Sequence, residues 1–345
     1  VGEVLFGDRV SATKIRATSA VVPKAVELAW TTDIGGKLTQ PVCSGSQVFV
    51  ASIDSHQLHA LSVVSGEKEW SYTAGARIDS SPTLTKGLVI FGSADGYVTC
   101  LRQTDGDLVW QFHAAPETRF IVNRGQLEST WLHLFSAAGL LGEEWFIRAY
   151  WLFGTNTGAG YGRWANMTSG NSKQAPAGRI LAFDDQHMYG YGRVKHASGW
   201  TGHRGDSNHL FRSVKVYEPP KAIRRQSAKT KRQSPAEKAF TWSHEHPLIV
   251  RSMVLTADKL VVAGVPDLAR KDSSERSFSN PDDALAALAG LRGSYLAMIS
   301  TESGETTYKT SLPGPPVFDG MSATNGRVFV SLKNGYVTCF GEREE

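Results

Sequence analysis

Residues 47–110 carry one pattern twice: Gln47-Val-Phe-Val-Ala51, Gln57-Leu-His-Ala-Leu-Ser62 and Ser65-Gly-Glu-Lys-Glu-Trp70, then Leu88-Val-Ile-Phe-Gly-Ser93, Tyr97-Val-Thr-Cys-Leu101 and Asp105-Gly-Asp-Leu-Val-Trp110. Together with Trp30, the two tryptophans form a series spaced by 40 residues (70 − 30 and 110 − 70). Short alternating runs that end in glycine-centred turns are typical of strands. A period of roughly 40 residues with about four strands indicates a β-propeller blade.

The unit returns in the rest of the chain. Near the C-terminus, Asn334-Gly-Tyr-Val-Thr-Cys-Phe340 follows Gly326-Arg-Val-Phe-Val-Ser331 and repeats Gly96-Tyr-Val-Thr-Cys-Leu101 almost letter for letter. Weaker copies lie between, at 178–183, 185–190 and 210–216, and at 259–264, 294–299 and 303–308, where Tyr308 takes the place of the tryptophan. Because one small sheet cannot bury both of its faces, these units are expected to stack around a common axis.

The predicted fold is therefore all-β: a single β-propeller with five to eight four-stranded blades of about 40 residues, interrupted by loop and short-helix insertions. We expect the propeller domain at 30–342, with insertions at 116–175, 219–239 and 267–292, a lead-in segment at 1–29 and a tail at 343–345. Within the third insertion, Asn280-Pro-Asp is a helix N-terminal signal, and the Ala/Leu pattern up to Leu291 predicts a short helix.

The repeat resembles that of the pyrroloquinoline-quinone (PQQ)-like propellers, the superfamily of quinoprotein alcohol dehydrogenases and of the propeller lipoprotein of outer-membrane protein assembly. It is more closely similar to large bacterial PQQ-binding-like β-propeller repeat proteins abundant in planctomycetes. The resemblance rests on the stretches 74–82, 87–96, 114–117, 178–184 and 316–321. It implies an exported protein of the periplasm or cell envelope. It also implies eight blades, with a further one after Trp131, where Leu132 begins another segment at once; the chain is thus expected to be a fragment or variant lacking one or more blades.

Quinone chemistry lacks its usual residues in this sequence. A quinoprotein dehydrogenase needs a planar cofactor on the propeller axis, a divalent cation held by carboxylate and amide oxygens, and an aspartate base. In the enzymes that the chain resembles, a vicinal cysteine pair helps to enclose the cofactor. Here Cys43, Cys100 and Cys339 are dispersed and read as small buried hydrophobes. No cofactor is expected; PQQ with calcium follows from the resemblance alone, and no ligands for it are found.

Other catalytic and binding chemistries are equally unsupported. His244-Glu-His246 has no evident third metal ligand and reads as a surface pair, and neither a Gly-x-Ser-x-Gly elbow nor a phosphate-binding loop occurs. The formal net charge is only +4. The basic run from Lys221 to Lys238 has no interleaved aromatics and reads as a solvated loop, so nucleic-acid binding is not expected, although a salt-dependent polyanion contact stays as a third possibility.

The irregular segment 116–175 is the candidate binding surface, because binding residues of propellers usually lie on loops. Aromatic and charged side chains are interleaved there, and the candidate ligand-binding residues are Arg119, Arg124, Glu128, Trp131, Trp151, Tyr161, Arg163 and Trp164. The alternative is that these aromatics pack the insertion onto a blade, as interblade packing already explains Trp30, Trp70 and Trp110. We expect a non-catalytic binding or scaffolding module with a protein or small-ligand partner; the alternative is a quinone- or carbohydrate-binding enzyme or sensor.

The two ends of the chain predict how the ring closes. The last unit, about 316–340, has two clear strands, and the polar tail after it is too short to add more. Since propellers remove exposed sheet edges by pairing their ends, residues within 1–35 are predicted to join this sheet, with Ala25–Trp30 as donor and Trp30 near the last blade. No signal peptide opens the chain, and the apolar stretch 132–153 contains charges such as Glu143 and Arg148, so no transmembrane segment is expected.

Overall fold

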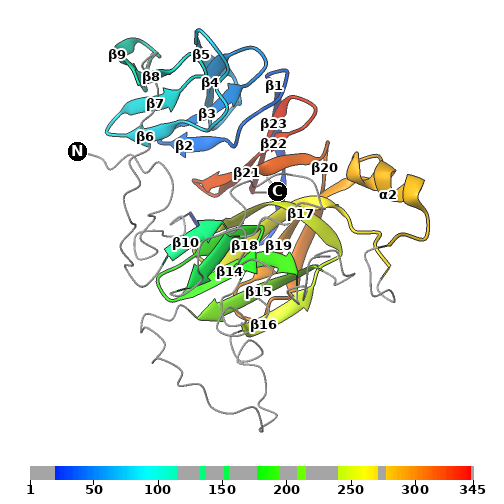
Figure 1. The fold of residues 1–345 in the computed structure, drawn as a ribbon. Coiled ribbons are helices and arrows are strands. Elements are labelled where there is room, and N and C mark those ends of the chain that lie inside the picture. The colour runs from blue at the N-terminus through cyan, green and yellow to red at the C-terminus, as the bar shows by residue number, and fades with distance from the viewer. Residues whose placement is uncertain are drawn as a thin grey trace, which may run out of the picture.

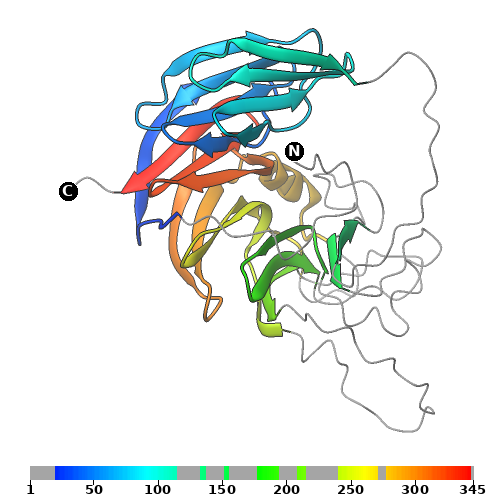
Figure 2. The same cartoon turned by 90° about the vertical axis from the view of Figure 1, so that its left-hand side faces the viewer.

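The computed structural model describes residues 20–114, 133–136, 151–154, 177–193, 208–214, 240–270 and 277–342. These residues form five four-stranded antiparallel sheets and one three-stranded sheet. The four-stranded sheets follow one another around an arc, as the two ribbon views show (Figure 1, Figure 2). The predicted all-β propeller architecture is confirmed.

Four of the five blades are simple meanders in which each strand pairs with the next. Their strands are β2 (Val42–Ser44), β3 (Gln47–Ser52), β4 (Gln57–Ser62) and β5 (Lys68–Thr73); β6 (Thr83–Thr85), β7 (Leu88–Gly92), β8 (Tyr97–Arg102) and β9 (Leu108–His113); β13 (Ile180–Phe183), β14 (His187–Arg193), β15 (Asn208–Val214) and β16 (Phe240–Glu245); and β17 (Leu248–Leu255), β18 (Lys259–Pro266), β19 (Ser294–Ser300) and β20 (Thr306–Leu312). The three-stranded sheet contains β10 (His133–Ser136), β11 (Trp151–Gly154) and β12 (Ala177–Gly178).

The fifth blade joins the two ends of the chain. It contains β21 (Pro316–Thr324), β22 (Arg327–Leu332) and β23 (Tyr336–Glu342), and β1 (Val26–Asp33) supplies its fourth strand. β1 pairs antiparallel with β23, with Thr31 opposite Thr338. The Trp30 ring centroid lies 5.8 Å from that of Phe329 on β22. The prediction that the N-terminal segment completes the last blade is therefore confirmed.

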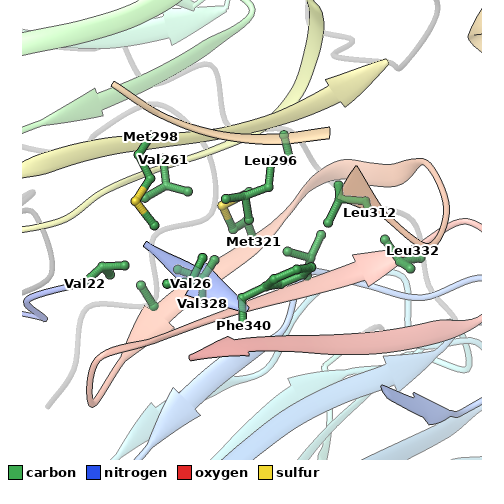
Figure 3. Packing of buried hydrophobic residues seen from close by; sticks show 13 residues of the cluster. Val22, Val26, Val261, Leu296, Met298, Leu312, Met321, Val328, Leu332 and Phe340 are labelled. Carbon is green, nitrogen blue, oxygen red and sulfur yellow. The ribbon is translucent and has the colours of Figure 1, made fainter. Parts of the chain in front are cut away.

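The hydrophobic core lies between blades. The inner strands contact one another in the order β13, β17, β21, β2 and β6, which fixes the order of the blades around the arc. Between the β17–β20 blade and the fifth blade, Val261, Leu296 and Met298 face buried residues that include Val26, Met321 and Phe340 (Figure 3). Comparable clusters fill the other three interfaces. Because both faces of a blade are apolar, its stability depends on its neighbours.

The predicted short helix is α2 (Pro281–Leu288), inserted between β18 and β19. The Asn280 side-chain oxygen accepts hydrogen bonds from the backbone N–H of Asp282 at 3.1 Å and of Asp283 at 3.2 Å, which is the N-cap that the sequence signal anticipated. Arg292 donates to the Asp283 carboxylate at 2.6 Å. None of the helices in the described part of the chain has the length and hydropathy needed to cross a membrane.

Candidate functional site

A cross-strand row of three residues recurs at the same place in the blades. One row is Phe49, Ala60 and Trp70 on β3, β4 and β5, and the register of the outer strand shifts directly after it. The matching rows are Ile90–Cys100–Trp110, Tyr189–Arg212–Trp242, Val261–Met298–Tyr308 and Phe329–Cys339–Trp30. Cys100 and Cys339 are thus equivalent and fully buried, as predicted. Burial raises the pKa of the Cys339 thiol to about 11, so it stays protonated at neutral pH.

The outer tryptophans join each blade to the next through a turn. The indole N–H of Trp30 donates to the Val63 carbonyl at 3.1 Å, and that of Trp70 donates to the Gln103 carbonyl at 3.0 Å. Each acceptor lies three residues before a glycine, Gly66 or Gly106, whose φ is +74° or +77°. Since the indole covers the glycine, these tryptophans belong to blade packing, as predicted.

A Cβ atom has no room at these glycines. At Gly66 it would lie 2.5 Å from Cδ2 of Trp30, and at Gly106 it would lie 2.6 Å from Cε3 of Trp70. The positive φ is itself unfavourable for any residue with a side chain. Glycine is therefore needed for two reasons: it adopts the positive φ of the turn, and its lack of a Cβ leaves room for the indole ring.

Trp242 makes the same contact, and sequence reasoning missed it. Its indole N–H donates to the Thr301 carbonyl at 3.0 Å, three residues before Gly304, whose φ is +77°. The helical insertion in the β17–β20 blade lengthens the interval from Trp242 to Gly304. Trp242 therefore does not fit the 40-residue spacing by which the other tryptophans were recognised. The Ser303-Gly304 turn after a buried strand was the signal that could have found it.

Trp110 is the exception among these tryptophans, and its packing between blades stays a prediction. Its side chain is 41% exposed, and the neighbouring Leu108 and Phe112 are 52% and 64% exposed. Every residue of β9 is exposed. No described blade packs on this strand, so its indole has none of the contacts that Trp30, Trp70 and Trp242 make. We call Trp110 and Phe112, which lie on one side of β9 opposite Cys100 and Val98, the β9 face.

A second feature lies where the inner strands converge. The register of β21 jumps from Pro316 to Met321, and the intervening loop is pinned by Ser252 of β17. The Ser252 hydroxyl donates to the Val317 carbonyl at 2.7 Å and accepts from the Gly320 N–H at 3.0 Å. The loop presents Phe318 and Asp319, and the latter has a φ of +54°.

The loop carries a half-buried carboxyl, and a cation from the segment between β12 and β13 lies over its aromatic ring. The guanidinium of Arg179 lies 5.9 Å from the centre of the Phe318 ring, a cation–π distance. Burial raises the pKa of Asp319 to about 6. Within the described residues no hydrogen bond or ion pair to its carboxylate occurs, so nothing offsets the desolvation of the charge.

The raised pKa of Asp319 predicts a pH dependence of stability. Because the folded protein binds this proton more tightly than the unfolded chain, its contribution is most favourable below about pH 4 and is lost as pH rises to about 6. Replacement of Asp319 by asparagine should remove this loss and make the protein more stable by about 2 kcal/mol at pH 7, a value reduced for partial exposure. Urea unfolding of both proteins from pH 4 to 8 measures the difference; equal curves at every pH would contradict it.

Most residues of the predicted binding surface lie outside the described residues, namely Arg119, Arg124, Glu128, Trp131, Tyr161, Arg163 and Trp164; so does the basic run from Lys221 to Lys238. Trp151 begins β11, where its backbone is opposite Ser136 and Gly178. Their grouping into one binding surface therefore stays a prediction.

The histidine pair behaves as a structural element. His244 stacks on Trp242 with ring centroids 5.8 Å apart, and its Nε2 lies 2.8 Å from the Ser303 carbonyl. Burial lowers the pKa of His246 to about 4. In the part of the chain that is described, no group of three or more His, Cys, Asp or Glu side chains is placed to hold a metal ion.

Comparison with known proteins agrees with the repeats. Residues 15–132 match the family model described as outer membrane protein assembly factor BamB. Together with the five four-stranded blades and the tryptophan–glycine contacts, this match defines the class: a β-propeller built from PQQ-like repeats.

The relatives can be named individually. The outer membrane protein assembly factor BamB of Moranella endobia (strain PCIT) is 26% identical over 116 residues, which is 32% of this chain and 30% of that protein. Among solved structures, BamB from Moraxella catarrhalis aligns at 13% identity and a TM-score of 0.29 over 90% of this chain and 83% of that one. The WD40 β-propeller domain of Doa1 aligns at 12% identity and a TM-score of 0.34 over 89% of this chain and 79% of that one.

Proposed function

We propose that the protein is a non-catalytic propeller that acts as a binding or scaffolding module in the bacterial cell envelope, with a protein as its partner. The observation that carries the proposal is the β9 face, where Trp110 and Phe112 are exposed, although the equivalent Trp30, Trp70 and Trp242 each pack against a turn of the neighbouring blade. Exposed aromatic side chains on the edge strand of a sheet are a typical protein-binding surface.

The matched relative supports the same class of function. Its name describes an assembly factor of the outer membrane, which is a role in binding other proteins. The chain spans 30% of that relative's length, so the transfer is limited to the kind of module and to a periplasmic or envelope location.

A second candidate function is the binding of a quinone- or carbohydrate-like small ligand. The arrangement of Arg179 over Phe318, the residue that precedes Asp319 in the loop, favours it, because a cation over an aromatic ring can bind a planar or polyhydroxylated molecule. This cluster lies on the inner strands, whereas the β9 face lies on an outer strand.

One experiment separates the two functions. The purified chain is incubated with PQQ and Ca²⁺, or with oligosaccharides, and both the melting temperature and dye-linked alcohol oxidation are measured. We expect no quinone absorbance, no dye reduction and no rise in melting temperature. Alcohol oxidation would overturn the non-catalytic assignment, and stabilisation without turnover would favour the small-ligand function.

A further inference from the structure

We propose that acid opens the interface between the β2–β5 blade and the fifth blade, because the imidazole of His59 is buried there without a partner for an added proton. We call this interface the closure seam, since it joins the blade that β1 completes to the blade that follows β1 in the chain. Apolar side chains fill the closure seam from both blades, namely Val48, Val50 and Leu61 on one side and Phe329, Val337 and Cys339 on the other.

His59 faces the closure seam from β4. Leu61 of the same strand belongs to the closure seam, whereas Leu58 and Ala60 belong to the cluster that faces the β6–β9 blade. Because side chains alternate along a strand, His59 lies on the same side as Leu61. It is 4% exposed. Both blades that form the seam are described along their whole length, over residues 26–73 and 316–342.

The closed seam suits the neutral ring of His59 and not the charged one. Neither Nδ1 nor Nε2 makes a hydrogen bond to a described residue. A neutral imidazole has one N–H donor and one acceptor nitrogen, whereas an imidazolium has two donors and a full charge. Burial of a charge without a hydrogen-bond partner is far more costly than burial of a neutral polar group. Protonation of His59 therefore favours separation of the two blades.

Charges within the β2–β5 blade increase this preference. The ammonium of Lys68 on β5 acts on His59 as a like charge. Two carboxylates of the blade are engaged by other groups. Glu69 accepts from the Gln47 side chain at 2.5 Å, and Asp54 accepts from a backbone N–H in the connection from β1 to β2 at 3.0 Å.

The fifth blade places a thiol and a cation on the closure seam. The Cys339 thiol stays protonated, since its pKa is raised to about 11, and the Arg327 guanidinium donates to its sulfur at 3.7 Å. Opposite them, β2 contributes Cys43, whose pKa burial raises to about 12. Among these described groups, Arg327 is a second positive charge on the seam, so an imidazolium at His59 would add to the repulsion.

The direction of the pH effect follows from the two states of His59. Burial and the Lys68 charge lower the pKa of His59 to about 4 in the closed seam, from an ordinary value of 6.5 that it regains on opening. The closed seam is therefore most favoured above about pH 6.5, and its advantage is lost as pH falls toward 4. Between pH 7.5 and pH 5 the ratio of open to closed molecules should rise roughly tenfold or more.

The cysteines of the chain can report the opening. Cys43 and Cys339 lie on the closure seam, whereas Cys100 is equally buried but lies in the β6–β9 blade, outside it. Labelling with a dipyridyl disulfide, in which the cysteine sulfur bonds to one pyridyl sulfur and the other leaves as thiopyridone with the proton, is followed at each cysteine by mass spectrometry. Each rate is divided by that of the urea-unfolded chain at the same pH. From pH 7.5 to pH 5, we expect this relative rate to rise about tenfold or more at Cys339 and to change less than about twofold at Cys100.

Substitutions of His59 test its role. His59→Leu removes the titrating group and should abolish the rise at Cys339. His59→Gln is also uncharged over this pH range and should give the same result, even if leucine disturbs the packing of the seam. The matched control is His56→Asn in the turn before β4, because asparagine tolerates its φ of +59°, and it should leave the rise unchanged.

Two results would overturn the proposal. One is a rise at Cys339 that persists in both His59 variants. The other is an equal rise at Cys100, which would mean that the whole propeller unfolds instead of opening at one seam. Neither a partner nor a ligand takes part in the measurement, so its failure would leave the proposed function untouched.

Discussion

Replacement of Gly106 by alanine is expected to lower the free energy of unfolding by about 3 kcal/mol. Two costs add: an L-residue at a φ of +77° is strained by roughly 1 kcal/mol or more, and the new Cβ lies 2.6 Å from the Trp70 indole, an overlap that typically costs 1–3 kcal/mol. The overlap is with a ring that also packs at a tilt against Phe49 and donates a hydrogen bond to the Gln103 carbonyl, so the ring has little freedom to move.

Gly87 supplies the matched control for this prediction. Its φ of +76° is nearly the same, but no atom lies within 4 Å of an added Cβ. Gly87→Ala should therefore show the backbone cost alone, about 1 kcal/mol. Urea unfolding of the two variants isolates the contribution of the tryptophan. If both variants lost the same stability, the tryptophan–glycine contact would not hold adjacent blades together.

The sequence could predict the features that depend on local pattern. The strand pair 326–331 and 334–340 was recognisable because it repeats the earlier unit and its turn contains Asn334-Gly335, whose glycine has a φ of +86°. The helix after Asn280 was recognisable from its cap. The closing strand was predictable from the number of strands in the last repeat unit, because that unit lacked strands that Ala25–Trp30 could supply.

Features that depend on a neighbour were not predictable. Trp70 and Trp110 occupy identical places in their repeats, yet only Trp70 meets a turn from a described blade. Likewise the loop at Phe318 and Asp319 is held by Ser252, a residue of another blade, and no local signal requires Asp319 to adopt a positive φ. The repeat sequence shows which contacts a blade is able to make, whereas the neighbouring blades determine which of these contacts form.

Closure of the fifth blade by β1 leads to the second large expected effect, from Val26→Asp. Val26 is fully buried among Val328, Phe340 and Met298, in the interface between the fifth blade and the β17–β20 blade (Figure 3). An aspartate there would be a carboxylate without a partner, so we expect a loss of about 4 kcal/mol or more in the free energy of unfolding. Opening of β1 would also expose the edge of β23, which should promote aggregation when the protein is concentrated.

Val21→Asp is the matched control, because Val21 is 63% exposed and precedes β1, and it should change the free energy of unfolding by less than about 0.5 kcal/mol. Urea unfolding and light scattering measure both effects; a Val26→Asp protein as stable and monomeric as the Val21→Asp protein would show that β1 does not close the blade in solution.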